Sequence, residues 1–406
     1  MHVPDGFINA PVSVAAGVAA AGAVALSLRG ARRELGGGPA TDAAGTTAER
    51  TAPLAGLVAA FIFAVQMLNF PVAAGTSGHL LGGALAAILV GPYTGVLCVA
   101  VVLLMQGVLF ADGGLTALGV NILVMGVVTV LVAYGIFRGL LRVLPSGRRT
   151  VTGASFAAAL ISVPMAAIAF TGLYAIGGTA DVALGKVFAA MAGVHVLIGL
   201  GEAAITAATV GAVIAVRPDL VYGARDLASR KLELRTSAVA VPGGGTAQKP
   251  RSAAGAGAEA GAGETGGPQP VAVAPIAPRR ANRKVWLGGL TAALLCAGVV
   301  SFYASASPDG LEKVAADNGI DEKAQDHAAK DSPLADYGIA EIADTRLSGG
   351  LAGVIGVGAT LAVGSGVFVV VRRRRAEGEE NAASANSATP AGTSASSASG
   401  SDGGAV

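Results

Sequence analysis

The residues best suited to chemistry in this sequence are its four histidines, and the one at position 2 is the most unusual. A second-position histidine can chelate a divalent metal through three nitrogens: the amine of Met1, the deprotonated amide of His2 and a ring nitrogen of His2. The two fused chelate rings favour a planar arrangement, which suits Ni(II), Cu(II) or low-spin Co(II). The chelate requires that Met1 is kept, and an initiator methionine is normally removed only before a small residue. Many second-position histidines have no such role, so a fourth nitrogen is needed to complete the square.

His79 offers this fourth nitrogen. It lies in the segment NFPVAAGTSGHLLGGALAAILVGP, whose glycines allow close backbone approach, and whose Thr76 and Ser77 can hydrogen-bond an imidazole or the start of a helix. The apolar run that follows, 80–90, is too short to span a membrane alone, which indicates a re-entrant loop lining a cavity. We therefore predict that His79 meets His2 at a metal ion. The alternative is a histidine that packs at a helix cap.

A second cluster lies inside a long apolar run. His195 and Glu202 are seven residues apart in the run 187–216, so they share one face of a helix. Ionisable residues within an apolar span are costly and are functional candidates by default. Two interpretations stay open: a hydrogen-bonded pair that holds neighbouring helices together, or a role beside the metal or on its release path. Asn69, which borders the His79 segment, is a further candidate to support the ligands.

The elements that must position these residues are membrane helices. Apolar and aromatic residues make up 53% of the 406 residues, 60 are glycine, only 13% are charged and the mean hydropathy is +0.63. These values exclude a soluble globular enzyme, a disordered protein and a disulfide-rich secreted domain, and the net charge of +2 gives nucleic acid no electrostatic support. We predict an all-α integral membrane protein in the lipid bilayer. Nine apolar runs are candidate spans: 10–28, 53–68, 80–90, 96–110, 115–137, 151–176, 187–216, 285–304 and 351–371.

The basic residues predict how these spans are oriented. With Met1 outside, the segments 29–52, 91–95, 138–150, 217–284 and 372–406 are cytoplasmic, and they hold 23 of the 28 lysines and arginines. This distribution follows the positive-inside rule. It predicts nine crossings, an external N-terminus and a cytoplasmic C-terminus. It also counts 80–90 as a crossing, because its removal would invert every later loop.

The spans fall into two modules. Residues 1–220 form a seven-helix module, 221–284 read as a flexible cytoplasmic linker rich in Ala, Gly and Pro, 285–375 form a two-helix module, and 376–406 read as a disordered cytoplasmic tail. The loop between the last two spans, 305–349, carries ten acidic and four basic residues. It is either a solvated acidic loop or a surface that attracts cations or docks on the first module.

Motifs for chemistry by this chain itself are absent from the sequence. There is no G-x-x-x-x-G-K-[ST], H-E-x-x-H, G-x-S-x-G or C-x-x-C. A transporter built on this chain must therefore draw energy from a partner or an ion gradient. Two other functions remain as alternatives: an ion-gradient-coupled divalent metal carrier, and an intramembrane enzyme that uses His195 and Glu202.

Several long segments resemble the CbiM/NikM family. They are MHVPDGFINAPVS, NFPVAAGTSGHLLGGALAAILVGPYTG, FADGGLTALGVNILVMGVV and HVLIGLGEAAIT, and together they cover about residues 1–220. The second module, with SPDGLEKVA at 307–315, resembles the PDGLE-type, NikN/CbiN-like component that accompanies this family. Here it is fused to the first module.

The resemblance implies a function. Members are the metal-binding membrane components of energy-coupling-factor importers, a class of ABC transporter, in the cell membrane. They work with a transmembrane coupling subunit and ATP-binding cassette ATPases, CbiQ/CbiO-like, so this chain is expected to be a transporter subunit with no cofactor of its own and not an enzyme. The family's ligand roles fall on Met1, His2 and His79. The first module's resemblance suggests Co(II) for cobalamin biosynthesis and the PDGLE-type module suggests Ni(II), so the choice of ion stays open.

Overall fold

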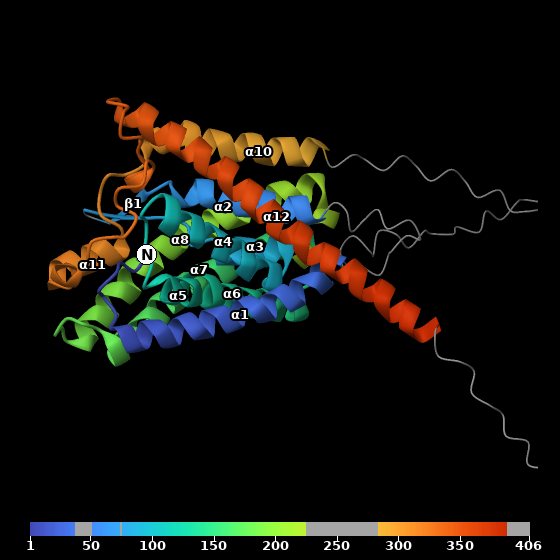
Figure 1. Cartoon of the computed structure of the whole chain (residues 1–406), viewed down its shortest axis with the longest axis horizontal. Helices are drawn as coiled ribbons and strands as arrows, with labels where there is room; N and C mark the ends of the chain where they lie inside the picture. The colour runs from blue at the N-terminus through green and yellow to red at the C-terminus, as the bar shows by residue number, and fades with distance from the viewer. Residues whose placement is uncertain (37–50, 74, 225–282, 388–406) are drawn as a thin grey trace, which may run out of the picture.

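The computed structural model describes residues 1–36, 51–73, 75–224 and 283–387, and the structural statements below concern these residues. They form a bundle whose long helices run roughly along one axis (Figure 1). The helices and strands are α1 (Ala10–Gly36), α2 (Thr51–Gln66), β1 (Phe70–Ala73), β2 (Thr76–Gly78), α3 (Gly83–Val90), α4 (Pro92–Leu109), α5 (Leu118–Asn121), the π-helical η2 (Ile122–Val128), α6 (Thr129–Val143), α7 (Arg148–Gly177), α8 (Leu184–Val216), α10 (Arg283–Gly298), α11 (Gly310–Asn318) and α12 (Thr345–Ser387). Short 3-10 turns lie at η3 (Pro218–Leu220), η4 (Tyr222–Ala224), η5 (Val300–Tyr303), η6 (Asp321–Lys323) and η7 (Ala335–Tyr337).

Seven helical stretches of the described chain are long and apolar enough to cross a membrane, against nine predicted runs. The other two runs are the 16-residue α2 and the eight-residue α3. At about 1.5 Å per residue α3 is only about 12 Å long, so it does not cross by itself. Residues 80–82 lengthen this passage, because His79 lies beside Met1 whereas Gly91, after α3, contacts Glu34 at the end of α1. The third passage is thus part loop and part helix.

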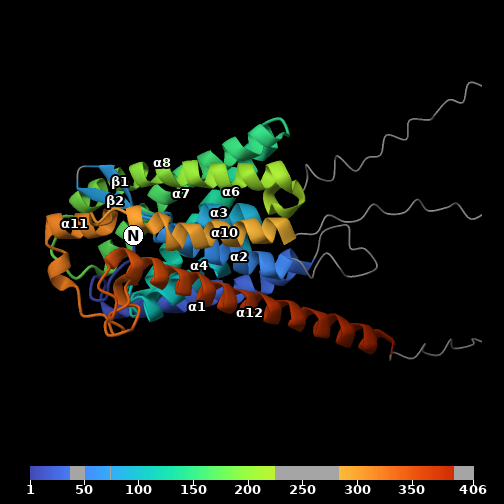
Figure 2. The ribbon, with the colours of Figure 1, turned by 90° about the horizontal axis from the view of Figure 1, so that it is seen from above.

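The bundle has two distinct ends. The site end carries Met1, the hairpin of β1 and β2, and α11, and the views in Figures 1 and 2 agree on this. At the far end, Glu34 accepts hydrogen bonds from the backbone N–H groups of Tyr93 and Thr94, and η4 packs on Phe137. The described parts of the segments predicted to be cytoplasmic therefore gather at one end of the bundle. Which end faces outside stays a prediction.

A small hairpin interrupts the otherwise helical fold. β1 and β2 pair antiparallel, with Phe70 opposite Gly78 and Pro71 opposite Ser77. The chain then runs through Gly82, whose φ of +85° places it in the left-handed region where a side chain would also meet Ile62. The glycine turn redirects the chain from the hairpin into α3. The sequence prediction of an all-helical protein did not include this hairpin.

The second module packs along the first. α12 lies along α2, and α10 contacts both of them (Figure 2). Glycines make this approach possible: a side chain at Gly56 would collide with Ser365, and one at Gly356 would collide with Phe63. Small residues that bring backbones together are typical of helix contacts in membranes. Helix α12 continues to Ser387, past residue 375 where the sequence analysis ends the module; 388–406 and residues 225–282 of the predicted linker lie outside the described residues.

Candidate metal centre

The first nine residues precede α1 and turn into the bundle, where Met1 is 2% exposed. Val3 anchors this segment through a reciprocal pair of bonds with Asn121. Its N–H donates to the Asn121 Oδ1 at 2.8 Å, and its carbonyl accepts from the Asn121 Nδ2 at 3.1 Å. The same carbonyl accepts from the Gly114 N–H at 2.9 Å. An amide with both ends engaged fixes position and direction together, so the amine is delivered to a defined place.

Asp5 holds the loop between α4 and α5 against the N-terminal segment. Its carboxylate accepts from the N–H of Leu115 at 3.2 Å and from the N–H and hydroxyl of Thr116 at 2.8 and 2.5 Å. Gly113, in the same loop, has a φ of +79°, and a side chain there would lie 3.1 Å from the His2 Cβ. The loop therefore closes tightly around His2.

Met1 and His79 meet inside the bundle. The amine nitrogen lies 2.5 Å from the His79 Nε2. The other ring nitrogen, Nδ1, lies 3.0 Å from the Leu80 carbonyl, which can only accept. Nδ1 therefore carries the hydrogen, and the lone pair of Nε2 faces the amine. This is the tautomer in which Nε2 can bind a metal ion.

Glu202 positions the His79 loop from helix α8. Its carboxylate is fully buried and accepts from the N–H groups of Leu81 at 2.7 Å and Gly82 at 3.2 Å. On the other side, the Gln66 Nε2 donates to the Leu81 carbonyl at 2.8 Å. The backbone that follows His79 is thus fixed from two helices. Glu202 acts on the loop rather than as half of a pair with His195.

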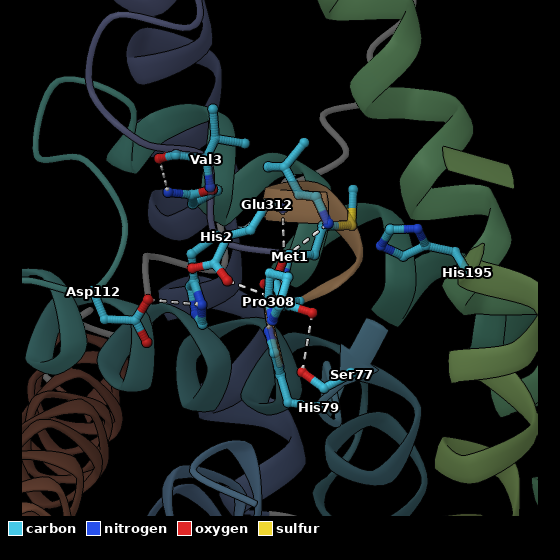
Figure 3. Close-up of polar contacts among 12 residues, drawn as sticks. Met1, His2, Val3, Ser77, His79, Asp112, His195, Pro308 and Glu312 are labelled. Atoms are coloured by element: carbon cyan, nitrogen blue, oxygen red, sulfur yellow. Dashed lines mark hydrogen bonds and ion pairs between the residues drawn. The ribbon is translucent and has the colours of Figure 1, made fainter. Parts of the chain in front are cut away.

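His195 lies close to the same site but does not bond Glu202. Its Nδ1 donates to the Met191 carbonyl at 2.8 Å, and its buried Nε2 has no hydrogen-bond partner among the described residues. In Figure 3 its ring faces the Met1 side chain. The interhelical bonds expected of this pair are therefore made by Glu202, whereas His195 bonds its own helix. The competing interpretation, a role near the metal site, is compatible with this position.

The ring of His2 stacks on that of His79, with centroids 4.9 Å apart and planes 11° apart. Its Nδ1 lies 3.0 Å from the Asp112 Oδ1, and its Nε2 lies 3.2 Å from the Gln106 Oε1 (Figure 3 draws the Asp112 contact). The Gln106 Nε2 donates to the Tyr337 hydroxyl at 2.9 Å, which donates to Asp112 at 2.6 Å. The Asp112 and Gln106 oxygens that face the His2 ring can only accept hydrogen bonds.

Asp112 is the acidic partner of His2. Burial by itself would raise the pKa of Asp112, but the charge and hydrogen bond of His2, together with the Tyr337 hydroxyl, hold this pKa well below its usual value. Asp112 therefore stays ionised. A cation that takes the His2 Nδ1 must displace its hydrogen and its contact with Asp112.

A residue of the second module reaches the amine as well. The Asp309 Oδ2 lies 2.5 Å from the Met1 nitrogen and 3.5 Å from the His79 Nε2. The Asp309 Oδ1 caps helix α11 by accepting from the N–H groups of Leu311 at 2.8 Å and Glu312 at 2.9 Å. Asp309 thus joins the second module to Met1, which is 308 residues away in the sequence.

These buried groups shift one another's proton affinity. Burial, and then the positive charge of the amine, lower the pKa of His79 below 6.5, against the opposing pull of Asp309. Burial would raise the pKa of Asp309, but the amine and His79 bring it well below 3.8. His79 is thereby kept neutral, as a metal ligand must be, and Asp309 is kept negative.

Of the other predicted supporting residues, Ser77 and Asn69 bond the second module. The Ser77 N–H donates to the Pro308 carbonyl at 2.8 Å and its hydroxyl donates to the Ser307 carbonyl at 2.7 Å. The Asn69 carbonyl accepts from the Ser305 N–H at 2.7 Å. Thr76 is buried in β2, beside Ser77. The β1–β2 hairpin therefore binds the segment that precedes Asp309.

A cavity of about 560 Å³ opens onto the predicted ligands. His2 and His79 line it together with acidic residues of both modules, namely Asp5, Asp112, Asp309, Glu312 and Asp336. His327 also lines it and contacts the Gly113 carbonyl at 3.1 Å. The acidic loop thus docks on the first module and forms part of the cavity wall, which gives a cation a negative surface to approach.

Side chains alone do not explain a metal site here. In the described ranges, no three His, Cys, Asp or Glu side chains are grouped so as to hold a metal ion. The further donors that a metal ion needs here are backbone groups: the amine of Met1 and the amide of His2. Sequence reasoning missed Asp309, although the SPDGLE segment that contains it was the signal for the second module.

Comparison with known proteins assigns the family. Residues 2–220 match the CbiM family, described as a cobalt uptake substrate-specific transmembrane region. The chain belongs to the CbiM family. Residues 283–373 match the PDGLE domain. The protein is therefore a multi-pass membrane component of cobalt or nickel transport, of the CbiM/NikM type, and not an enzyme.

This CbiM-family chain is similar to several known proteins. A putative metal transport protein of Haloquadratum walsbyi is 41% identical over 226 residues, which cover 55% of this chain and 94% of that protein. A putative fused nickel transport protein NikMN of Archaeoglobus fulgidus is 40% identical over 226 residues, 54% of this chain and 68% of that protein. The crystal structure of a transition metal transporter, at 24% identity and a TM-score of 0.45, covers 58% of this chain and 100% of its own.

Proposed function

We propose that this chain is the substrate-binding membrane component of an energy-coupling-factor importer for Co(II) or Ni(II). The ion is bound by the Met1 amine, the His2 amide and Nδ1, and the His79 Nε2. The observation that carries the proposal is the 2.5 Å approach of the amine to the lone pair of His79 beside the stacked ring of His2. Two donors at right angles, each about 2.0 Å from one metal ion, lie about 2.8 Å apart, so the observed spacing needs only a small adjustment.

The surrounding residues then have distinct roles. Asn121 and Asp5 deliver the N-terminal segment, and Glu202 fixes the loop that presents His79. Asp112 holds the His2 ring through the Nδ1 until a cation takes this nitrogen. Burial of these groups favours an ion that is fully coordinated over a hydrated one. Release therefore requires that the arrangement is broken.

The energy for release comes from partners. The sequence has no nucleotide-binding P-loop motif, so ATP hydrolysis is assigned to separate ATPases that act through a transmembrane coupling subunit. Metal uptake by cells that express this chain is expected only when these partners are present. Full uptake in cells without any ATPase partner would contradict this part of the proposal.

The ligand set is tested by moving the amine by one residue. The full-length protein is titrated separately with Co(II) and Ni(II), with its own N-terminus and with one glycine inserted before Met1. Tight binding is expected to vanish on insertion, because the amine no longer closes a chelate ring with the His2 amide. A protein with the glycine added at the C-terminus serves as the matched control, and the intact mass establishes that Met1 begins the chain. Unchanged binding after insertion would overturn the ligand set.

A further inference from the structure

Asp309 stands out among the acidic residues of the cavity because it contacts two predicted ligands at once. Its Oδ2 is 2.5 Å from the Met1 nitrogen and 3.5 Å from the His79 Nε2, while these two nitrogens are 2.5 Å apart. For atoms at such separations, a point on either side of their common plane lies about 2.0 Å from all three. That length is an ordinary metal–nitrogen or metal–oxygen bond. The three atoms therefore have the spacing of donors in one coordination sphere.

The position of this oxygen is fixed by its surroundings. The Asp309 Oδ1 is held by the first turn of α11, and the Glu312 carboxylate accepts from the Asp309 N–H at 2.8 Å. The preceding carbonyls rest on Ser77. The following residue, Gly310, packs so closely on helix α8 that a side chain would lie 2.9 Å from Val194 and 3.0 Å from Ile198. With Oδ1 engaged in the cap, Oδ2 is left to face the amine.

A carboxylate also answers an electrostatic need of the proposed site. A divalent ion bound by an amine, a deprotonated amide and two imidazoles keeps one net positive charge. Burying an uncompensated charge is costly, and buried charges in proteins are paired or coordinated. Asp309 is 7% exposed and supplies the missing negative charge at bonding distance. A planar set of four nitrogens leaves the positions above and below the plane open, and a carboxylate oxygen can occupy one of them.

We propose that the PDGLE-type module contributes a ligand of its own: the Asp309 Oδ2 binds the transported ion directly, as an oxygen donor beside the four nitrogens. This inference rests on the proposed function, because it takes the amine, His2 and His79 as the other ligands. It assigns the fused module a chemical part in substrate binding. The metal centre is then shared by the two modules and complete only when the acidic loop is docked.

The test compares Asp309→Asn with the wild-type full chain. Asparagine caps helices about as well as aspartate, so α11 and its docking are retained. The affinity for Ni(II) and Co(II) is expected to fall by about 10- to 100-fold, at least the range caused by loss of a group that supports a ligand. The X-ray absorption edge spectrum of bound Ni(II) is expected to indicate a five-coordinate ion in the wild type and a planar four-coordinate ion in the variant.

Asp336→Asn is the matched control. Asp336 lines the same cavity with a φ of +53°, a conformation that asparagine adopts readily, so the variant removes the same charge without strain. Its affinity is expected to change by less than about fivefold, the reach of a solvent-screened charge. Two results would overturn the inference: Asp309→Asn binding within fivefold of the wild type or tighter, or a planar four-coordinate signature in the wild type.

The glycine insertion before Met1 is repeated in the Asp309→Asn background. If insertion abolishes binding in both backgrounds while Asp309→Asn alone changes nothing, the proposed function stands and the carboxylate ligand is rejected. If insertion leaves binding intact, the proposed function itself is rejected. The two failures are therefore distinguishable.

Discussion

The N-terminal segment and the acidic loop between α10 and α12 reach the same cavity, but they are held there in different ways. The N-terminal segment is fixed by side chains of the first module, with Asn121 bracketing Val3 and the Asp5 carboxylate gripping the α4–α5 loop. The acidic loop is held by main-chain groups in addition to the side chains of Asp309, His327 and Tyr337. Its carbonyls at Ser307 and Pro308 accept from Ser77, and the Asp336 N–H donates to the Phe110 carbonyl.

The two regions therefore contribute different groups to the candidate metal site. The proposed nitrogen donors all belong to the first module, where Asn121 holds the N-terminal segment. The carboxylate of Asp309 arrives only when the second module docks. Loss of a nitrogen donor of the first module is therefore expected to abolish tight binding. Loss of a group that supports the donors, or of the Asp309 carboxylate, is expected to weaken it.

Removal of the loop histidine has the largest expected effect. His79→Ala takes away the Nε2 that faces the amine, and the affinity for Co(II) or Ni(II) should fall by more than about 100-fold, the upper range for loss of a supporting group. Isothermal titration of the full chain measures this. His327→Ala is the control, since His327 lines the same cavity but contacts only the Gly113 carbonyl and a nearby N–H. Equal losses in the two variants would remove the distinction drawn here.

Loss of the anchor of the N-terminal segment has the next largest effect. Asn121→Ala removes both side-chain bonds to Val3, so the amine is no longer directed to His79. We expect an affinity loss of about 10- to 100-fold, with His79 itself unchanged. A dissociation constant equal to that of the wild type would show that the segment is positioned without Asn121.

The acidic loop is expected to show itself in the pH dependence of stability. The pKa of Asp309 is lowered in the folded chain, so its contribution to stability is present above the unfolded pKa of about 3.9 and is lost as the pH falls through the folded pKa. Near pH 6, metal-free Asp309→Asn should be less stable than the wild type by about 1.5–3 kcal/mol. Thermal unfolding in detergent should show this difference shrink below about pH 4. A difference that is the same near pH 3 and pH 6 would contradict the ion pair.

Loss of the Ser77 hydroxyl bond to the acidic loop has the smallest expected effect. Ser77→Ala removes the hydroxyl bond to the Ser307 carbonyl but keeps the backbone bond to Pro308. The cost to stability is about 1 kcal/mol, and the metal affinity should change by only a few fold. A loss as large as that of Asn121→Ala would mean that the two regions are held equally firmly.

Much of the fold follows from the apolar runs. Each predicted run contains a helix, because an apolar stretch in a bilayer has few other ways to satisfy its backbone. The part-extended third passage and the β1–β2 hairpin were harder to foresee. Their form depends on Glu202 and Gln66, which reach the His79 loop from other helices.

The candidate site also has a part that the sequence predicts and a part that it does not. Met1 and His2 are adjacent, so their chelate is visible in the first two residues of the sequence. The approach of Asp309 depends on how α12 and α10 pack on α2, and no local pattern encodes a contact across about 300 residues. The bonding partners of His195 and Glu202 could not be predicted for a similar reason. Helical spacing placed His195 on one face with Glu202, but the His79 loop takes the Glu202 carboxylate.

The central claim is that the transported ion sits at the N-terminus of the chain. It is tested most directly by a structure of the full-length protein with Co(II), with the ion located by its anomalous scattering. The account predicts one ion within bonding distance of the Met1 nitrogen, the His2 amide and Nδ1, and the His79 Nε2. An ion bound elsewhere, for example at His195 or among the exposed carboxylates of the acidic loop, would contradict it.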